Sequence, residues 1–147
     1  MAEMVVRPLT PRDIEAWVGL RHKLWPAEST TSLRDELATL AADEFAGFGA
    51  FEGERLVGFA EVSQRPYGDG CDTAPVAWLE GIFVLAEYRR RGVGRQLVSA
   101  VEAWALAKGL VELGSDAELD NLTSRLSHAL WGFAETERAV RFRKVLS

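Results

Sequence analysis

A strand, a glycine-rich loop and a helix follow one another in residues 78–101, and this succession limits the possible folds more than any other stretch. Its first seven residues are Trp, Leu, Glu, Gly, Ile, Phe and Val, a composition typical of a β-strand. After the loop, Val93, Leu97 and Val101 recur every four residues, which predicts a helix with one apolar face. Such a unit predicts a β-α-β crossover in an α/β sheet.

The loop itself reads Arg-Arg-Arg-Gly-Val-Gly over residues 89–94. Glycines let the backbone approach a ligand closely, and the first N–H groups of a helix lack intrahelical acceptors. Together with the positive end of the helix dipole, they favour an anion such as phosphate. The loop contains neither the dinucleotide fingerprint G-x-G-x-x-G nor the Gly-Lys-Ser/Thr of a P-loop. A solvated turn is the alternative interpretation of the loop taken alone, and its place between a strand and a helix favours a binding site.

The composition is that of one globular domain, which we expect to span residues 1–147. Hydrophobic residues make up 48% and charged residues 27%. No apolar run is long enough for a membrane span, and no secretory leader is expected. Because Cys71 is the only cysteine, an intramolecular disulfide is impossible and a cytoplasmic protein is the expectation. Two histidines and one cysteine predict no metal cluster.

The formal charge of -5 and the pI of about 5.1 argue against nucleic acid as a partner, since phosphate backbones require a basic surface. An acidic surface would instead attract a cationic substrate.

Residue patterns predict six strand regions and four helices. The expected strands are 4–9, 45–51, 56–64, 78–84, 111–115 and 133–145, and the expected helices are 10–25, 32–42, 92–108 and 121–131. This order predicts a mixed central β-sheet flanked by helices on both faces.

The loop at residues 89–94 resembles the acyl-CoA-binding motif of the GNAT superfamily of N-acetyltransferases. That motif is Gln or Arg, two residues, Gly, one residue, then Gly or Ala. The predicted order of elements is also that of the superfamily, so the resemblance covers nearly the whole chain.

Several short segments make the resemblance closer. They are Leu24-Trp25-Pro26, Asp69-Gly70-Cys71-Asp72, Leu79-Glu80-Gly81-Ile82-Phe83-Val84-Leu85, Ser115-Asp116 with Asn121, Gly132-Phe133, and Glu135-Thr136-Glu137-Arg138. Together they are similar to the short aminoglycoside 6'-N-acetyltransferases. The resemblance implies acetyl transfer from acetyl-CoA to the 6'-amino group of these antibiotics, by direct attack in a ternary complex, which confers resistance. It also implies a homodimer with the C-terminal strands near the interface.

The implied cofactor contacts are largely backbone groups. Ile82, Phe83 and Val84 would pair with pantetheine like an added strand, and the Val84 N–H would meet the thioester carbonyl. The residues implied around the pyrophosphate are Arg89, Arg90, Arg91, Gly92, Val93, Gly94 and Arg95. Asn121 matches a position that hydrogen-bonds the cofactor, although a helix N-cap explains it equally well.

Glu80 is the first candidate for catalysis. An unpaired charge within Leu-Glu-Gly-Ile-Phe-Val is too costly to bury, so Glu80 either faces solvent or serves a site. In the second case it would bind the substrate ammonium and take its proton, directly or through water. Asp116 would approach the same cleft, although Ser-Asp is also common in turns. Which of these carboxylates is the base stays open.

His128 stands where many superfamily members carry a tyrosine, the proposed acid for the CoA thiolate. Histidine can donate a proton near neutral pH, but a structural role on a short helix is the alternative.

Trp25, Tyr67 and Glu137 match substrate-contact positions of the resembling enzymes. Trp25 also reads as a core residue at a helix end, and Glu137 as a strand charge. Glu28 departs from the family, where a histidine is expected, although a carboxylate there could add ammonium affinity.

Two other functions fit the same residues. One is a GNAT acetyltransferase for another amine, such as a polyamine, a protein N-terminus or a lysine. The other is a non-catalytic acyl-CoA-binding module.

Overall fold

The structure, a computed structural model, describes residues 3–147, and the chain divides into two compact units. The larger unit, Met1–Ser115, holds the β-sheet and the first three α-helices. The smaller unit, Asp116–Ser147, holds the fourth α-helix and a long irregular tail.

One five-stranded sheet forms the centre of the larger unit. In spatial order its strands are β1 (Met4–Pro8), β2 (Phe45–Glu52), β3 (Arg55–Arg65), β4 (Val76–Val84) and β5 (Leu113–Gly114). Neighbouring strands are antiparallel from β1 to β4, whereas β4 and β5 are parallel. Helix α3 (Val93–Ala107) connects this parallel pair, which confirms the predicted β-α-β crossover.

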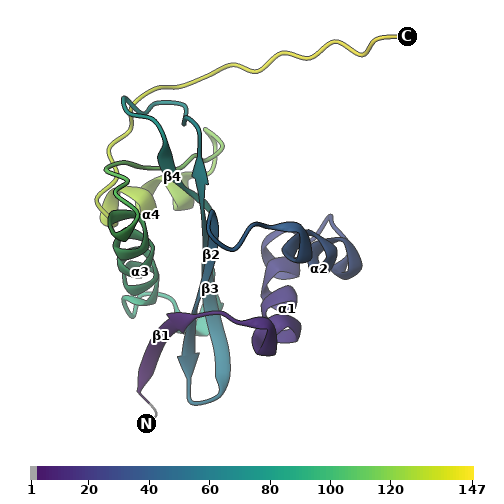
Figure 1. Ribbon diagram of the computed structural model, residues 1–147, viewed down its shortest axis with the longest axis vertical. Helices are drawn as coiled ribbons and strands as arrows, with labels where there is room; N and C mark the ends of the chain where they lie inside the picture. The colour runs from purple at the N-terminus through teal and green to yellow at the C-terminus, as the bar shows by residue number, and fades with distance from the viewer. Residues whose placement is uncertain (1–2) are drawn as a thin grey trace. The chain divides into compact units, whose positions relative to one another are not determined.

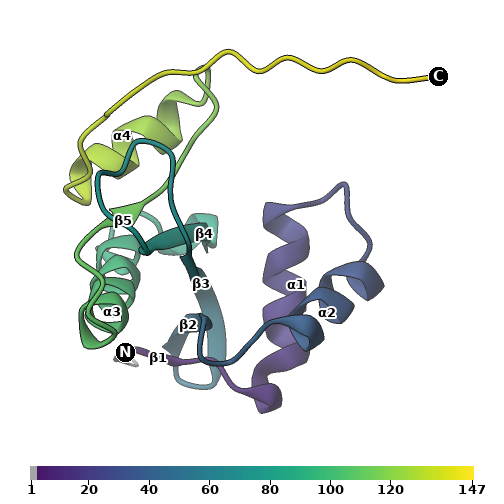
Figure 2. The ribbon, with the colours of Figure 1, turned by 45° about the horizontal axis from the view of Figure 1, so that its top comes forward.

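Helices cover both faces of the sheet. Helix α1 (Ile14–Leu24) packs on β3 and β4, α2 (Thr30–Thr39) packs on α1, and α3 covers the opposite face (Figure 1 and Figure 2). The predicted mixed α/β sheet with helices on both faces is therefore confirmed. None of the helices within residues 3–147 is both long and apolar enough to cross a membrane.

The spacing of apolar residues correctly identified the buried side of α3. Val93, Leu97 and Val101 are at most 2% exposed. The start of α2, in contrast, lies earlier than the sequence pattern indicated. The hydroxyl of Ser29 accepts a hydrogen bond from the N–H of Ser32 at 3.0 Å and caps the helix, which therefore begins at Thr30, two residues before the predicted start.

A buried ion pair joins α1 to β3. Arg21 and Glu61 are each 1% exposed. The guanidinium donates from Nε to Oε2 at 2.6 Å and from Nη2 to Oε1 at 2.7 Å. Trp17 Nε1 donates to the same carboxylate at 2.8 Å, and Arg21 Nη1 donates to the Leu33 carbonyl at 3.1 Å. The charges are thus enclosed in a hydrogen-bonded network, as burial of a carboxylate requires.

The smaller unit has α4 (Leu122–Leu130) as its only helix, and its remaining residues form no strand. The strands predicted over residues 133–145 are therefore wrong for the described chain. A strand is held by hydrogen bonds to a neighbouring strand, and the smaller unit contains no second strand with which the tail could pair. Val140 and Phe142 are accordingly 79% and 91% exposed.

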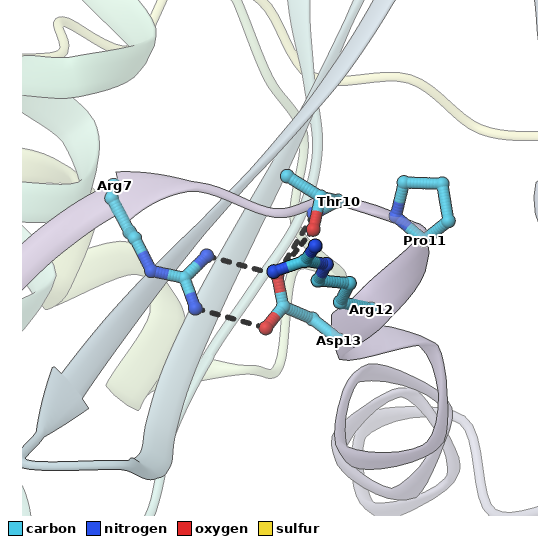
Figure 3. A pocket seen from close by; sticks show the side chains of 5 residues that line it. All are labelled: Arg7, Thr10, Pro11, Arg12 and Asp13. Atoms are coloured by element: carbon cyan, nitrogen blue, oxygen red, sulfur yellow. Dashed lines mark hydrogen bonds and ion pairs between the residues drawn. The ribbon is translucent and has the colours of Figure 1, made fainter.

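A hollow of about 570 Å³ lies where β1 leads into α1 (Figure 3). Two hydrogen bonds of 2.9 Å join the guanidinium of Arg7 to the carboxylate of Asp13, and the Thr10 N–H donates to the same carboxylate at 2.9 Å. The hydrogen bond from Arg7 is the main cause that lowers the pKa of Asp13 to about 2. These contacts tie the first strand to the first helix, so we assign the hollow a structural role.

Replacing Glu61 by alanine is expected to lower the free energy of unfolding by about 3–5 kcal/mol, because the Arg21 charge would remain buried without its partner. Urea unfolding followed by circular dichroism measures this change. Glu15→Ala is the matched control, since its ion pair with Arg34 is largely exposed and is expected to contribute about 1 kcal/mol or less. Equal losses for the two variants would contradict the assignment.

The low pKa of Asp13 predicts a pH dependence of stability. A carboxylate with a lowered pKa stabilises the fold above its unfolded value of 3.8, and this contribution disappears as the pH falls towards 2. Asp13→Asn should therefore lower the free energy of unfolding by about 1 kcal/mol at pH 6 and by progressively less below pH 4. The effect is modest because solvent screens the exposed Arg7. Unfolding midpoints measured across this range test the prediction. Asp35→Asn is the control, because it removes the same charge from an exposed position of α2. Its difference in stability from the wild type is not expected to shrink below pH 4.

Candidate active site

A β-bulge in β4 determines where Glu80 points. Glu61 on β3 pairs with Gly81, and the next residue, Val62, pairs with Leu79, so Glu80 is the extra residue. A bulge of this kind directs two consecutive side-chain positions to one face of the sheet. Gly81 lies on the α1 face, because a Cβ there would be 2.8 Å from the Trp25 ring. Glu80 reaches Ser63, which lines a pocket with residues of α1 and α2.

The carboxylate of Glu80 is held by two side chains of β3. Arg65 donates from Nε to Oε2 at 2.8 Å and from Nη2 to Oε1 at 2.7 Å, and the Ser63 hydroxyl also donates to Oε2. The Glu80 side chain is 27% exposed. The sequence indicated that this charge could not be buried alone, but the expected strand ended at residue 64, one residue before Arg65, and neither partner was predicted. The sequence shows that Ser63 and Arg65 are two residues apart and share one face of the strand, but only the pairing of β3 with β4 brings that face to Glu80.

Glu80 lines a pocket of about 240 Å³ between the sheet and the first two helices. Its other lining residues are Arg21, Trp25, Glu36, Leu40, Phe45, Glu61 and Ser63. Trp25 meets Phe59 edge-on, with 6.4 Å between ring centroids, and the Arg21 guanidinium lies 5.1 Å from the Trp25 ring centroid. Trp25 packs against the core and also lines the pocket, so its structural role is confirmed and its substrate contact stays a prediction.

One edge of β4 is available beside this pocket. Strand β5 pairs only with Ala77 and Trp78, so within the described sheet β4 has no neighbouring strand on that side from Leu79 to Val84. Backbone N–H and C=O groups along such an edge can pair with an extended ligand. The segment includes Ile82, Phe83 and Val84.

The loop after β4 has the backbone geometry that favours an anion. Arg90 and Gly92 have positive φ angles of 64° and 76°, which turn the chain into the start of α3 at Val93. Helix α3 then presents its first N–H groups and the positive end of its dipole at this loop. Arg89 donates from Nε to the Val84 carbonyl at 2.9 Å and so ties the loop to the end of β4. A strand edge that can pair with an extended amide chain therefore leads into a loop that can bind an anion.

Two predicted substrate contacts of the larger unit do not line the pocket. Glu28 is exposed beyond α1, and its carbonyl accepts a hydrogen bond from His22. Tyr67 is 73% exposed in the loop between β3 and β4. Glu112 clamps that loop by accepting hydrogen bonds from the N–H groups of Asp72 and Thr73, at 2.9 Å and 2.6 Å, and from the Thr73 hydroxyl. The hydroxyl bond is the main cause that lowers the pKa of Glu112.

The remaining predicted site residues belong to the smaller unit. Asp116 and Glu137 are exposed, and Asn121 accepts a hydrogen bond from the Ser124 N–H at 3.1 Å. The N-cap role of Asn121 is thus confirmed.

His128 sits at the C-terminal end of α4 in an aromatic setting. Its Nδ1 lies 2.7 Å from the Ser124 carbonyl oxygen, which fixes a proton on Nδ1. The ring packs against Trp131 and Phe133, with centroid distances of 5.5 Å and 5.1 Å. His128 therefore has a structural role. If it also acts as the acid for the CoA thiolate, the proton comes from Nε2, because Nδ1 is bonded to Ser124.

Neither a metal site nor a cysteine nucleophile is indicated. No group of three or more His, Cys, Asp or Glu residues within positions 3–147 is arranged to hold a metal ion. Burial raises the pKa of the Cys71 thiol, and the charges of Glu112 and Asp72 act in the same direction, which disfavours the reactive thiolate.

Comparison with known proteins gives consistent matches. The model of the acetyltransferase (GNAT) family matches residues 13–133. A protein named aminoglycoside N(6')-acetyltransferase type 1, from Salmonella enteritidis, is 43% identical over 143 residues, which is 96% of this chain and 99% of that protein.

Solved structures of similar proteins extend the comparison to three dimensions. The structure of AAC(6')-Iy in complex with the bisubstrate analog CoA-S-monomethyl-acetylneamine matches with a TM-score of 0.92 at 41% identity, over 99% of this chain and 100% of that one. The aminoglycoside antibiotic 6'-N-acetyltransferase AAC(6')-Ih from Acinetobacter baumannii matches over the same shares, with a TM-score of 0.90 and 37% identity.

Gly81→Ala is expected to destabilise the larger unit by about 1–3 kcal/mol, because the new Cβ would clash with Trp25 and displace the bulge. Thermal unfolding measures the loss. Gly19→Ala is the matched control, since a Cβ at that helix position meets nothing within 4 Å and is expected to stabilise α1 by up to about 1 kcal/mol. A Gly81→Ala protein as stable as the control would show that Trp25 does not constrain the bulge.

Proposed function

The chain belongs to the acetyltransferase (GNAT) family and has its fold, and on that premise we propose an activity. It transfers acetyl from acetyl-CoA to the 6'-amino group of aminoglycoside antibiotics and thereby confers resistance. The observation that carries the proposal is the position of Glu80 in a pocket next to the unpaired edge of β4. An amine acceptor and a thioester donor can meet there. The names of the relatives, which include a complex with an acetylneamine bisubstrate analog, support the choice of substrate.

The residues around β4 fit acetyl-CoA as the cosubstrate. When bound, it supplies the activated acetyl thioester. In our proposal, the backbone of Ile82, Phe83 and Val84 pairs with the pantetheine arm, and the Val84 N–H faces the thioester carbonyl. The pyrophosphate is held by the backbone of residues 89–95 with help from the arginine charges. Asn121 contacts the cosubstrate in addition to capping α4.

The chemistry needs a neutral amine and a stabilised leaving group. The amine nitrogen forms the new C–N bond, the C–S bond breaks, and the amine proton passes to Glu80 directly or through water. Asp116 provides a second carboxylate for the ammonium groups of the substrate. His128 gives a proton to the departing thiolate.

We assign the remaining substrate contacts to aromatic and acidic side chains. Trp25 and Tyr67 offer flat faces to sugar rings and ammonium groups, and Glu28 and Glu137 offer charge. The net charge of -5 supports a polycationic substrate.

Three further proposals concern the whole protein. The two units form one catalytic domain, which is supported by a family match that extends from residue 13 to 133 across both. The enzyme is cytoplasmic, which its single cysteine supports. It is a homodimer, which is supported by the exposed apolar residues of the smaller unit, Leu122, Leu126, Leu130, Val140, Phe142 and Val145.

The function is tested by thiol release from acetyl-CoA with neomycin and paromomycin, which differ only in an amine or a hydroxyl at the 6' position. Turnover with neomycin and little with paromomycin is expected. Equal turnover of the two drugs would show that the acetylated amine is not the one at the 6' position. No turnover with either, in protein that binds acetyl-CoA, would favour polyamines, peptides or a non-catalytic role.

Glu80→Gln should keep acetyl-CoA binding and lose at least about 100-fold in kcat, the usual contribution of a positioned acid or base. Calorimetric binding and steady-state rates measure the two properties. A fully active variant would remove Glu80 from the mechanism.

The dimer is tested by sedimentation velocity over a range of low concentrations. We expect a species of twice the chain mass, and Phe142→Asp should shift it towards the monomer by placing a charge in an apolar contact. A wild-type protein that sediments as a monomer would overturn this proposal.

A further inference from the structure

The hydrogen bonds at Glu80 leave one acceptor position open. A carboxylate has about four such positions, two on each oxygen. Arg65 Nε and the Ser63 hydroxyl donate to Oε2, whereas only Arg65 Nη2 donates to Oε1. Among the described residues, the remaining position is therefore on Oε1.

Arg65 is itself oriented by its neighbours. Its guanidinium carbon lies 4.7 Å from the centroid of the Trp78 ring, and its two donors meet the two oxygens of Glu80 in a fork. A contact with an aromatic ring and bidentate pairing together restrict the orientation of a guanidinium. The carboxylate of Glu80 is consequently held in one orientation, although 43% of the Arg65 side chain is exposed.

The other charged groups around the pocket come from α1, α2 and β3. Arg21 and Glu61 close on each other, and each is 1% exposed. Glu36 of α2 lies 3.5 Å from Arg21 and is half exposed. The positive charge of Arg65 balances the negative charge of Glu80, and Arg21 balances Glu61. The remaining negative charge of the pocket therefore comes from Glu36.

We propose that Arg65 is a positioning residue for acetyl transfer, which turns the open acceptor position of Glu80 Oε1 towards the substrate amine and offsets the charge of that carboxylate. The proposal rests on the proposed function, because it concerns an amine that must react. A bare carboxylate would bind an ammonium ion strongly and keep it protonated. Only the neutral amine has a lone pair for the thioester carbon. Arg65 weakens the attraction between Glu80 and the ammonium group while it keeps the carboxylate in its orientation. The proton of the ammonium group can then pass to Oε1 or to water.

The test compares Arg65→Gln, Arg65→Lys and Arg34→Gln. Arg34 is the matched control, because it is 40% exposed, pairs with Glu15 and does not line the pocket. The kcat of each variant is measured against pH at saturating acetyl-CoA, together with the KM for neomycin. For Arg65→Gln we expect kcat at pH 7 to fall about ten-fold and the acidic limb of the profile to move up by about one pH unit, with no rise in KM. Arg65→Lys keeps the positive charge, so the acidic limb of its kcat–pH profile should stay near that of the wild type.

Calorimetry gives a readout that does not depend on turnover. Neomycin binding is measured in two buffers of different ionisation enthalpy, which reports the protons released when the ammonium groups bind. Wild type and Arg34→Gln should release more protons than Arg65→Gln.

Several results would overturn the proposal. They are an Arg65→Gln profile that coincides with the Arg34→Gln profile, a loss of thermal stability with an unmoved acidic limb, and an equal shift for Arg65→Lys and Arg65→Gln. In each case wild-type turnover of neomycin shows that the proposed function still stands. A wild-type protein that neither acetylates nor binds any amine overturns the function itself, and the role of Arg65 with it.

Discussion

The bulge at Glu80 is the constraint on which the site depends. Without an extra residue in β4, regular alternation would place positions 80 and 81 on opposite faces of the sheet. The register shift instead turns both towards α1, where Trp25 allows only a glycine at one of them. The same strand loses its β5 neighbour after Trp78. One strand therefore supplies an acidic group on its face and an edge with no neighbouring strand.

The buried pair of Arg21 and Glu61 holds α1 in place against this strand pair. It is unusual for a core to enclose two charges, and the arrangement is tolerable because Trp17 and the Leu33 carbonyl complete the hydrogen bonds. The wall of the pocket that contains Trp25 is thereby fixed relative to β4.

The sequence predicted what depends on local pattern and missed what depends on register. Periodicity located α3 and its buried face, and the strand signals located β2, β3 and β4 to within two residues. The partners of Glu80 could not be derived in this way, because Ser63 and Arg65 come next to it only through a particular pairing of β3 with β4. Arg21 and Glu61 are 40 positions apart and posed the same difficulty. The strands expected over residues 133–145 failed for a related reason, since β-propensity is real there but the smaller unit contains no strand that could pair with this segment.

The contact between Arg89 and the Val84 carbonyl has a consequence for the choice of donor. It joins the loop that follows β4 to the last residue of that strand, which are the two parts of the proposed donor site. A site of this kind selects its donor by the length of the arm that carries the thioester. A thioester carried on an arm of the correct length reaches the pocket in register, and a shorter or longer carrier binds with its carbonyl out of line.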